Sequence, residues 1–261
     1  MTIIEIETYL KRKTDTLDQK IFDDLETYLK KYQKEEKEEE ANYCWCLKQI
    51  YTVKKGYLTA YHELKNHDFE NAWYNLERVD IELSFLEKNF DIGNEINDPY
   101  ALVYIKNTVP KFQKLFPYKV FTSREALIKK EVCSICGKEV KLRGGCTHKI
   151  GKLYMGKMCS RSVEDMEFIG VAVVTDPFDK YAILKIEGQE FNYDLIEYVS
   201  DNLKSPYDLW TYEIERKIQP KFQNLNRNDK CACGSGKKYK KCCMNTNRIY
   251  MEHYKIMVRQ S

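Results

Sequence analysis

The stretch Arg227-Asn-Asp-Lys-Cys231-Ala-Cys233-Gly-Ser-Gly-Lys-Lys-Tyr-Lys-Lys-Cys242-Cys243 decides how the C-terminal part of the chain folds. It places four sulfurs in two close pairs on either side of a loop rich in glycine and lysine. Structural zinc sites take four N or S ligands tetrahedrally, so two close pairs that a turn brings together can satisfy one ion. Gly234 and Gly236 supply the turn, because glycine adopts backbone conformations that other residues avoid. We therefore predict a closed zinc site with no coordination position left for chemistry.

This segment resembles the SEC-C motif, the zinc-binding element at the C-terminus of the SecA preprotein translocase ATPase, which also occurs in many otherwise unrelated bacterial proteins. The Cys-x-Cys and Cys-Cys pairs, their spacing and the Gly-Ser-Gly-Lys-Lys-Tyr core carry the resemblance. It implies that the zinc ligands are Cys231, Cys233, Cys242 and Cys243. It also implies that the module docks protein partners. The ATPase motor of SecA has no counterpart in the sequence.

The bulk composition is that of an ordinary globular protein. With 261 residues, 43% of them hydrophobic, the chain has room for one or two domains with a real core. The N-terminus carries acids where a signal peptide carries basic residues, and no apolar run approaches the ~18 residues of a membrane span. We therefore expect a cytoplasmic protein. In that reducing compartment the ten cysteines indicate thiolates for metal rather than disulfides, since eight of them fall in two clusters.

Charge divides the chain into an acidic and a basic half. Residues 1–100 carry 14 Lys and Arg against 22 Asp and Glu, whereas residues 101–261 carry 29 against 18. Four thiolates around a zinc ion leave a net charge of −2, so roughly +7 remains in the basic half when two sites are filled. This excess favours acidic partners, and the sequence leaves open whether the lysine-rich loop meets RNA, meets an acidic protein face or is only solvated.

The N-terminal part predicts a helical domain. Apolar residues from Ile21 to Tyr32 recur at helical spacing, and residues 57–90 predict an antiparallel helix pair broken at Asn66-His67-Asp68. Cys44 and Cys46 lie two apart on an expected helix, so their thiols point to different faces and we expect no redox pairing.

A second set of potential metal ligands lies in the middle of the chain: Cys133, Cys136, Cys146, His148 and Cys159. Cys133-Ser-Ile-Cys136-Gly137 has the form of a zinc knuckle, in which the glycine lets backbone N–H groups turn toward the sulfurs. These five candidates compete for the four places of a second zinc ion.

A hairpin over Gly151–Cys159, turning near Met155-Gly156, would return Cys159 to the neighbourhood of His148. We therefore take His148 and Cys159 as the first choice beside the Cys133–Cys136 pair, with Cys146 as the spare ligand. The alternative set uses Cys146, because Cys146 and His148 share one face if they lie on a strand.

The rest of the chain predicts an α+β fold. Ser123–Lys130 indicates a short helix or turn, residues 168–175 and 181–186 indicate strands, and residues 191–203, 209–218 and 249–258 indicate helices. Core positions on the strands are then Val171, Val173, Ile183 and Ile186. The predicted organisation is a helical domain (1–97), a helical linker (98–130), a zinc-ribbon-like β unit (131–190), helices (191–226), the SEC-C zinc motif (227–245) and a terminal helix (246–261).

Function is predicted from the two metal clusters. We expect a zinc-binding adaptor that docks a protein partner through the SEC-C motif, and not an enzyme. The alternative is an RNA- or ribosome-associated module that binds through the basic zinc knuckle, although only Tyr239 and Tyr250 near that loop offer rings for base stacking.

Two enzyme classes are disfavoured. A His-Asn-His nuclease would need further metal ligands after His148, and no His occurs between His148 and His253. The segment Gly151–Met158 resembles a phosphate-binding loop, but Met158 stands where the Ser or Thr that holds Mg²⁺ belongs. We therefore expect neither a nucleotide nor a catalytic residue.

Overall fold

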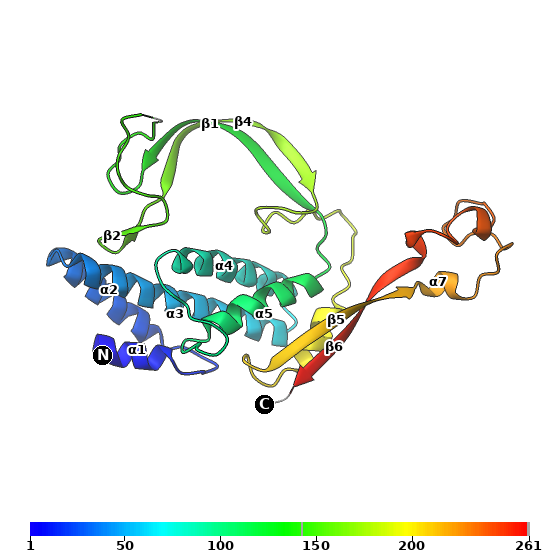
Figure 1. The fold of residues 1–261 in the computed structure, drawn as a ribbon, viewed down its shortest axis with the longest axis horizontal. Helices are drawn as coiled ribbons and strands as arrows, with labels where there is room; N and C mark the ends of the chain where they lie inside the picture. The colour runs from blue at the N-terminus through cyan, green and yellow to red at the C-terminus, as the bar shows by residue number, and fades with distance from the viewer. Residues whose placement is uncertain (142, 260–261) are drawn as a thin grey trace. The chain divides into compact units, whose positions relative to one another are not determined.

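The computed structural model describes residues 1–141 and 143–259 and divides the chain into two compact units. One unit comprises residues 1–201 and 205–207, and the other comprises residues 202–204 and the chain from 208 onward. Helices combine with small antiparallel sheets, which confirms the predicted α+β class (Figure 1). Positions 142, 260 and 261, which fall in the predicted β unit and terminal segment, lie outside the described residues.

Five helices form the core of the larger unit. They are α1 (Ile3–Leu10), α2 (Gln19–Lys34), α3 (Glu38–Lys65), α4 (Phe69–Glu87) and α5 (Leu102–Leu115). Helix α3 packs against both α2 and α4, and it buries apolar residues on several of its sides, among them Leu47, Ile50 and Val53. The helices predicted before residue 97 and their antiparallel pair are therefore present, with the break at residues 66–68, but the compact unit they belong to continues to residue 201.

A lysine side chain is fully enclosed within this helical core. Lys54 on α3 is fully buried, and its Nζ donates to the carbonyls of Leu10, at the end of α1, and Arg12. These carbonyls belong to a helix end, where backbone acceptors lack intrahelical partners. Burial lowers the pKa of the Lys54 amine to about 8. Lys54 therefore ties α1 to α3 through a desolvated amine.

A long antiparallel ribbon of β1 (Phe121–Cys133) and β4 (Arg161–Val174) leaves the helical core (Figure 1). Its base is fixed by Phe121, which is buried with its ring centroid 6.1 Å from that of Trp73 on α4. Trp73 also donates from its indole nitrogen to the Lys180 carbonyl at 2.8 Å. The prediction of a helix or turn at Ser123–Lys130 is wrong, because this segment pairs with a strand far downstream.

The apolar strand residues are not core residues. Val171, Val173 and Ile186 are 58%, 65% and 66% exposed, so the prediction that they are buried is wrong. Ile183 is half-buried and forms an isolated bridge with Phe121, in place of the strand predicted over residues 181–186. The prediction failed because alternation shows that a strand has two faces but not whether anything covers them.

Between β1 and β4 the chain forms a small hairpin of β2 (Leu153–Tyr154) and β3 (Lys157–Met158). It turns at Met155 and Gly156, as predicted. The helix predicted over residues 191–203 is present as α6 (Asp194–Asn202).

The smaller unit is built on a second antiparallel ribbon, β5 (Leu209–Ile218) with β6 (Tyr250–Arg259). Between the strands lie α7 (Pro220–Gln223) and two 3-10 helices, η1 (Tyr239–Lys241) and η2 (Asn247–Ile249). The helices predicted at 209–218 and 249–258, including the terminal helix of 246–261, are therefore wrong. Aromatic and β-branched residues alternate on these strands, and their cross-strand partners, such as Trp210 and Val258, are far apart in sequence.

None of the helices in the described residues is long and apolar enough to cross a membrane.

Candidate metal centres

The central cluster begins where β1 ends. Cys133 is the last residue of that strand, and its amide donates to the Lys138 carbonyl at 2.9 Å. Gly137, with φ of 69°, donates its amide to the Cys133 carbonyl at 2.8 Å, which closes the turn that carries Cys136. The Cys-x2-Cys-Gly sequence therefore forms the tight knuckle turn that its glycine predicts.

All five predicted donors meet around this turn. The ligand atoms of Cys133, Cys136, Cys146 and His148 lie within 4.8 Å of one another. The Cys133 sulfur is also 3.8 Å from the Cys159 sulfur and 3.7 Å from Nδ1 of His148. A tetrahedral zinc site with bonds of 2.0–2.3 Å spaces its ligands roughly 3.5–3.8 Å apart, so these donors fit the ion.

The group whose ligand atoms all lie within 4.8 Å contains Cys146, the predicted spare ligand, and Cys159 lies next to Cys133 beside this group. The two candidate ligand sets, one with Cys146 and one with Cys159, both include Cys133, Cys136 and His148. Which of Cys146 and Cys159 completes the site stays a prediction.

The groups around Cys133 favour the deprotonated form of its thiol. The backbone amides of Cys136 and Ile135 point at its sulfur and lower the pKa of the Cys133 thiol to about 6. Desolvation acts in the opposite sense on Cys159, which is 2% exposed, and raises the pKa of its thiol to about 11. Amide groups aimed at a metal-binding sulfur are what a zinc knuckle needs, because the ligand is the deprotonated thiol.

The β2–β3 hairpin, which lies between His148 and Cys159, fastens this cluster to the helical core. At the hairpin turn, Gln33 Nε2 donates to the Met155 carbonyl (2.8 Å) and the Gly156 amide donates to Asn42 Oδ1 (2.7 Å). Just before the hairpin, Asn89 Nδ2 donates to the Gly151 carbonyl (2.7 Å) and Lys152 Nζ donates to the Lys88 carbonyl (2.6 Å). Gly156 is buried against α2 and α3, where an added Cβ would lie 2.3 Å from Leu29 Cδ1. The segment that resembled a phosphate-binding loop is therefore a docking hairpin.

The helix residues that hold this hairpin were not predicted from the sequence. Gln33, Asn42 and Asn89 are single polar side chains in helical segments or just after one, and nothing in their local pattern distinguishes them from solvated residues. Their role depends on a hairpin more than sixty residues away in sequence.

The C-terminal cluster lies in the smaller unit, between β5 and β6. The sulfurs of Cys231, Cys233, Cys242 and Cys243 all lie within 4.8 Å of one another. The Cys233 and Cys242 sulfurs are 3.4 Å apart, and those of Cys242 and Cys243 are 3.7 Å apart. The four predicted ligands are therefore brought together in a group that fits a tetrahedral zinc ion.

The loop between the two cysteine pairs folds back as predicted. The Cys231 amide donates to the Lys237 carbonyl at 2.8 Å, and Gly234 and Gly236 have φ of 79° and 72°. The hydroxyl and amide of Ser235 lower the pKa of the Cys233 thiol to about 6. Burial raises the pKa of the Cys243 thiol to about 12.

A small core supports this site. Phe222, Tyr239 and Ile249 are buried together with Cys231 and Cys243. The rings of Phe222 and Tyr239 stack with centroids 5.8 Å apart. Because so few apolar residues bury little apolar surface, they stabilise this unit only weakly. In a unit of this size, binding of a structural metal supplies much of the folding free energy.

Among the residues that the structure describes, neither the other thiols nor the remaining group of close potential ligands, His67 with Glu197 and Asp201, forms a comparable site. Cys44 and Cys46 are buried on α3, and burial raises the pKa of their thiols to about 12 and about 11. His67 faces Glu197 from Nδ1 (3.5 Å) and Asp201 from Nε2 (3.1 Å). Because each carboxylate meets a different ring nitrogen, these contacts tie the α3–α4 turn to α6 rather than forming a chelate.

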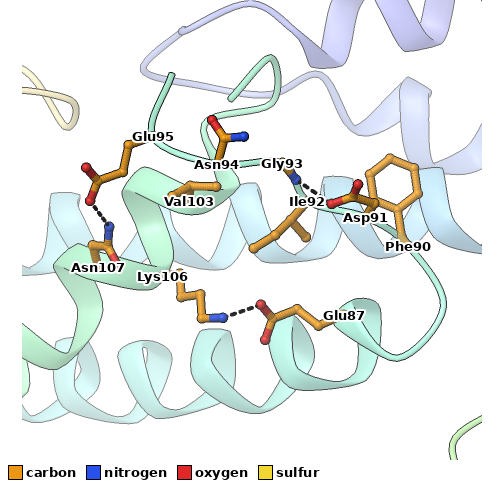
Figure 2. A pocket seen from close by; sticks show the side chains of 10 residues that line it. All are labelled: Glu87, Phe90, Asp91, Ile92, Gly93, Asn94, Glu95, Val103, Lys106 and Asn107. Atoms are coloured by element: carbon orange, nitrogen blue, oxygen red, sulfur yellow. Dashed lines mark hydrogen bonds and ion pairs between the residues drawn. The ribbon is translucent and has the colours of Figure 1, made fainter. Parts of the chain in front are cut away.

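An open cavity of about 500 Å³ lies beside the loop that joins α4 to α5 (Figure 2). Polar groups that line it are engaged with one another: Lys106 pairs with Glu87, and Asn107 donates to Glu95 at 3.4 Å. We assign it no ligand.

Comparison with known proteins identifies the C-terminal cluster. The model of the SEC-C motif matches residues 227–245, which confirms the predicted resemblance. The SecA protein translocase subunit of Lawsonia intracellularis is 41% identical over 70 residues, which is 25% of this chain and 8% of that protein. That of Ehrlichia ruminantium is 23% identical over 210 residues, 74% of this chain and 23% of the relative.

A UPF0225 protein of Geobacter sulfurreducens is 49% identical over 39 residues, 14% of this chain and 24% of its own length. These relatives carry the same motif, and this chain spans less than a quarter of the length of each. The rest of the chain is not assigned to a family, and no solved structure matches it.

Proposed function

We propose that this chain is a cytoplasmic zinc-binding adaptor whose SEC-C motif docks an acidic face of a protein partner. The observation that carries the proposal is a shell of exposed cations around a closed four-cysteine cluster. The SecA relatives are protein translocase subunits by name, which also supports a protein partner.

The charge of the SEC-C segment is strongly one-sided. Between β5 and β6 all the basic residues are exposed, and Asp229 is the one acid in this stretch of sequence. The exposed basic residues are Lys221, Arg227, Lys230, Lys237, Lys238, Lys240, Lys241 and Arg248. Even after the −2 charge of a zinc tetrathiolate, this segment remains positive enough to attract an acidic surface.

The alternative partner is RNA or the ribosome, and the aromatic residues count against it. Single-stranded RNA is bound through exposed rings on which bases stack. Tyr239 is 7% exposed and occupied by its stack on Phe222, which leaves Tyr250 as the exposed ring of the two expected ones. The cations alone could hold phosphates, but such binding would fall steeply with salt through counterion release.

The proposal assigns no catalysis to either cluster. Four thiolates fill a zinc ion at the SEC-C site, so no position remains for water or substrate. In the central cluster the Nδ1 atom of His148 faces the Cys133 sulfur, which supports a ligand role rather than that of a nuclease base. A nuclease would lose cleavage in His148→Ala, whereas the adaptor has no cleavage to lose.

Lysine-directed cross-linking with mass spectrometry tests the docking proposal on the full chain in cell extract, with and without ribonuclease. We expect cross-links from the lysines at 237, 238, 240 and 241 to an acidic protein, unchanged by ribonuclease. They should be lost in Cys242→Ser and in the double variant Lys240→Glu/Lys241→Glu. Lys114→Glu, which changes an exposed lysine on α5, is the matched control and should behave as the parent chain.

Two results would contradict the proposal. Loss of the cross-links on ribonuclease treatment would favour the RNA alternative. Cross-links that persist in Cys242→Ser would show that docking does not depend on the folded zinc motif.

A further inference from the structure

Two of the donors in the central cluster are attached to the β2–β3 hairpin. The first, His148, lies just before the hairpin, and its ring packs edge-on against Tyr154 of β2 with centroids 4.5 Å apart. The Tyr154 hydroxyl accepts a hydrogen bond from the Lys149 amide at 2.9 Å, which fixes the backbone next to His148. Contacts around a metal-binding imidazole set the orientation of its ring. The hairpin therefore positions His148 for the ion.

The second of these donors, Cys159, ends the hairpin segment. Its amide donates to the Lys152 carbonyl and its carbonyl accepts from the Gly151 amide, both at 2.8 Å. Its sulfur lies 3.8 Å from the sulfur of Cys133, the last residue of β1. The hairpin therefore also places Cys159 in the cluster, whether Cys159 or Cys146 completes the ligand set.

The hairpin is supported from its other side by helix residues that are not metal donors. At its turn the Gly156 amide donates to Asn42 Oδ1 on α3 at 2.7 Å, and the Met155 carbonyl accepts from Gln33 Nε2 on α2 at 2.8 Å. Its strands have two residues each, too few to hold a hairpin together in water without other contacts. The hairpin thus depends on two supports, the helices and the donor cluster.

We propose that zinc binding at the central cluster and docking of the β2–β3 hairpin on α2 and α3 are coupled, so that the hairpin acts as a clasp that the metal closes. When the hairpin is docked, His148 and Cys159 already lie beside Cys133. When it is undocked, the loop that carries these donors has to be ordered on binding, at a cost in conformational entropy. The docked state therefore binds zinc more tightly, and a ligand stabilises the state that it prefers.

The clasp determines how the β1–β4 ribbon is held. At the base of the ribbon Phe121 is buried beside Trp73, independently of any metal donor. At its far end the chain is held through the central cluster and the hairpin, and a two-stranded ribbon is marginally stable by itself. Loss of the central metal should release the far end and leave the base anchored. This metal-controlled release goes beyond the docking role of the SEC-C motif, whose metal site belongs to the other unit.

Amide hydrogen exchange on the zinc-loaded full chain tests the coupling through two variants that each remove a donor from one cluster. We expect residues 151–158 to be protected equally in the parent and in Cys242→Ser. In Cys136→Ser their protection should fall at least about 5-fold, the lower end of typical coupling between sites. The amides of α3 are the internal reference, and they should keep their protection in all three chains.

Coupling is reciprocal, so weaker docking should also weaken zinc binding. Gly156 donates nothing to the metal, and an added Cβ there meets α2 and α3, whereas at Gly188 it meets nothing within 4 Å. Gly156→Ala should therefore lower the zinc affinity of the central cluster at least about 5-fold relative to Gly188→Ala. Chelator competition measures this affinity in the Cys242→Ser background, where the central cluster is the zinc site under test.

Equal protection of residues 151–158 in Cys136→Ser and Cys242→Ser would overturn the coupling, because docking would then not depend on the central metal. Equal zinc affinity in Gly156→Ala and Gly188→Ala would overturn it from the other direction. If Cys136→Ser also loses protection in α3, the variant has unfolded more widely, and the affinity comparison decides.

Discussion

Replacing Gly156 by alanine should detach the central metal loop from the helical core. Gly156 has φ of 68°, and an added Cβ would lie 2.3 Å from Leu29 Cδ1 and 3.0 Å from the backbone oxygen of Ala41. A left-handed conformation costs a non-glycine residue about 1–2 kcal/mol, and overpacking at a buried contact costs about 1–3 kcal/mol more. We therefore expect Gly156→Ala to weaken hairpin docking by about 2–5 kcal/mol.

Gly188→Ala is the matched control. Gly188 has φ of 76°, and an added Cβ there meets nothing within 4 Å, so this variant has the backbone cost without the clash. The reduction in unfolded-chain entropy from glycine to alanine is common to both variants and cancels in the comparison. The difference between the two should therefore be about 1–3 kcal/mol, all of it from the contact of Gly156 with α2 and α3.

Amide hydrogen exchange across residues 151–158 measures this docking directly, because the Gly156 amide donates to Asn42 Oδ1. A loss of 1–3 kcal/mol lowers protection of that amide by roughly 5- to 150-fold in Gly156→Ala relative to Gly188→Ala. Urea unfolding of both variants shows whether the loss is local or global. Equal protection of residues 151–158 in the two variants would show that the hairpin does not lie against the helices.

Three further predictions concern other parts of the chain. Between pH 7 and pH 10, Lys54→Met should lose about 2 kcal/mol of stability relative to the parent. The parent gains stability as pH rises between the folded pKa of about 8 and the higher unfolded value, whereas methionine does not titrate. A pH-independent difference in urea unfolding would refute this. Cys44 and Cys46 should resist an aromatic disulfide reagent after chelation has exposed the other thiols, and should react only on unfolding; early labelling would argue against their burial. Phe222→Ala should destabilise the smaller unit by about 3–5 kcal/mol, because Phe222 supports the ring of Tyr239. The destabilisation is measured as faster release of the metal to a chelator. Unchanged release kinetics would contradict the role of that small core.

The parts of the structure that could be predicted are those with local causes. The knuckle at Cys231–Cys243 follows from ligand spacing and two glycines, and the Met155–Gly156 turn follows from a short segment between two ligands. Helices α3 and α4 were predictable because their apolar repeats are long and are broken at His67, which adopts φ of 58°.

The strands were missed where pairing is not local. Leu209–Ile218 carries apolar residues at spacings that suit a helix as well as a strand, and its partner β6 begins only after the whole SEC-C motif. The same holds for Ser123–Lys130, which pairs with β4. Burial was missed for a related reason, because the alternation of Val171 and Val173 indicates a face without showing what lies on it.

The ligand set of the central site was predictable only in part. Sequence spacing identified all five donors, and the structure brings them together. Choosing between Cys146 and Cys159 depends on how the loop between Gly137 and the β2–β3 hairpin is folded, and no spacing rule fixes that path.

Metal content per purified chain shows whether the chain holds two separate structural metal sites. Parent protein, Cys136→Ser and Cys242→Ser should be compared by elemental analysis, with Cys46→Ser as a control for a buried cysteine outside both clusters. We expect about two zinc ions in the parent and in Cys46→Ser, and the loss of one in each of the other two variants. A parent with one zinc ion that Cys136→Ser leaves unchanged would contradict the central site and leave the SEC-C motif as the sole metal centre.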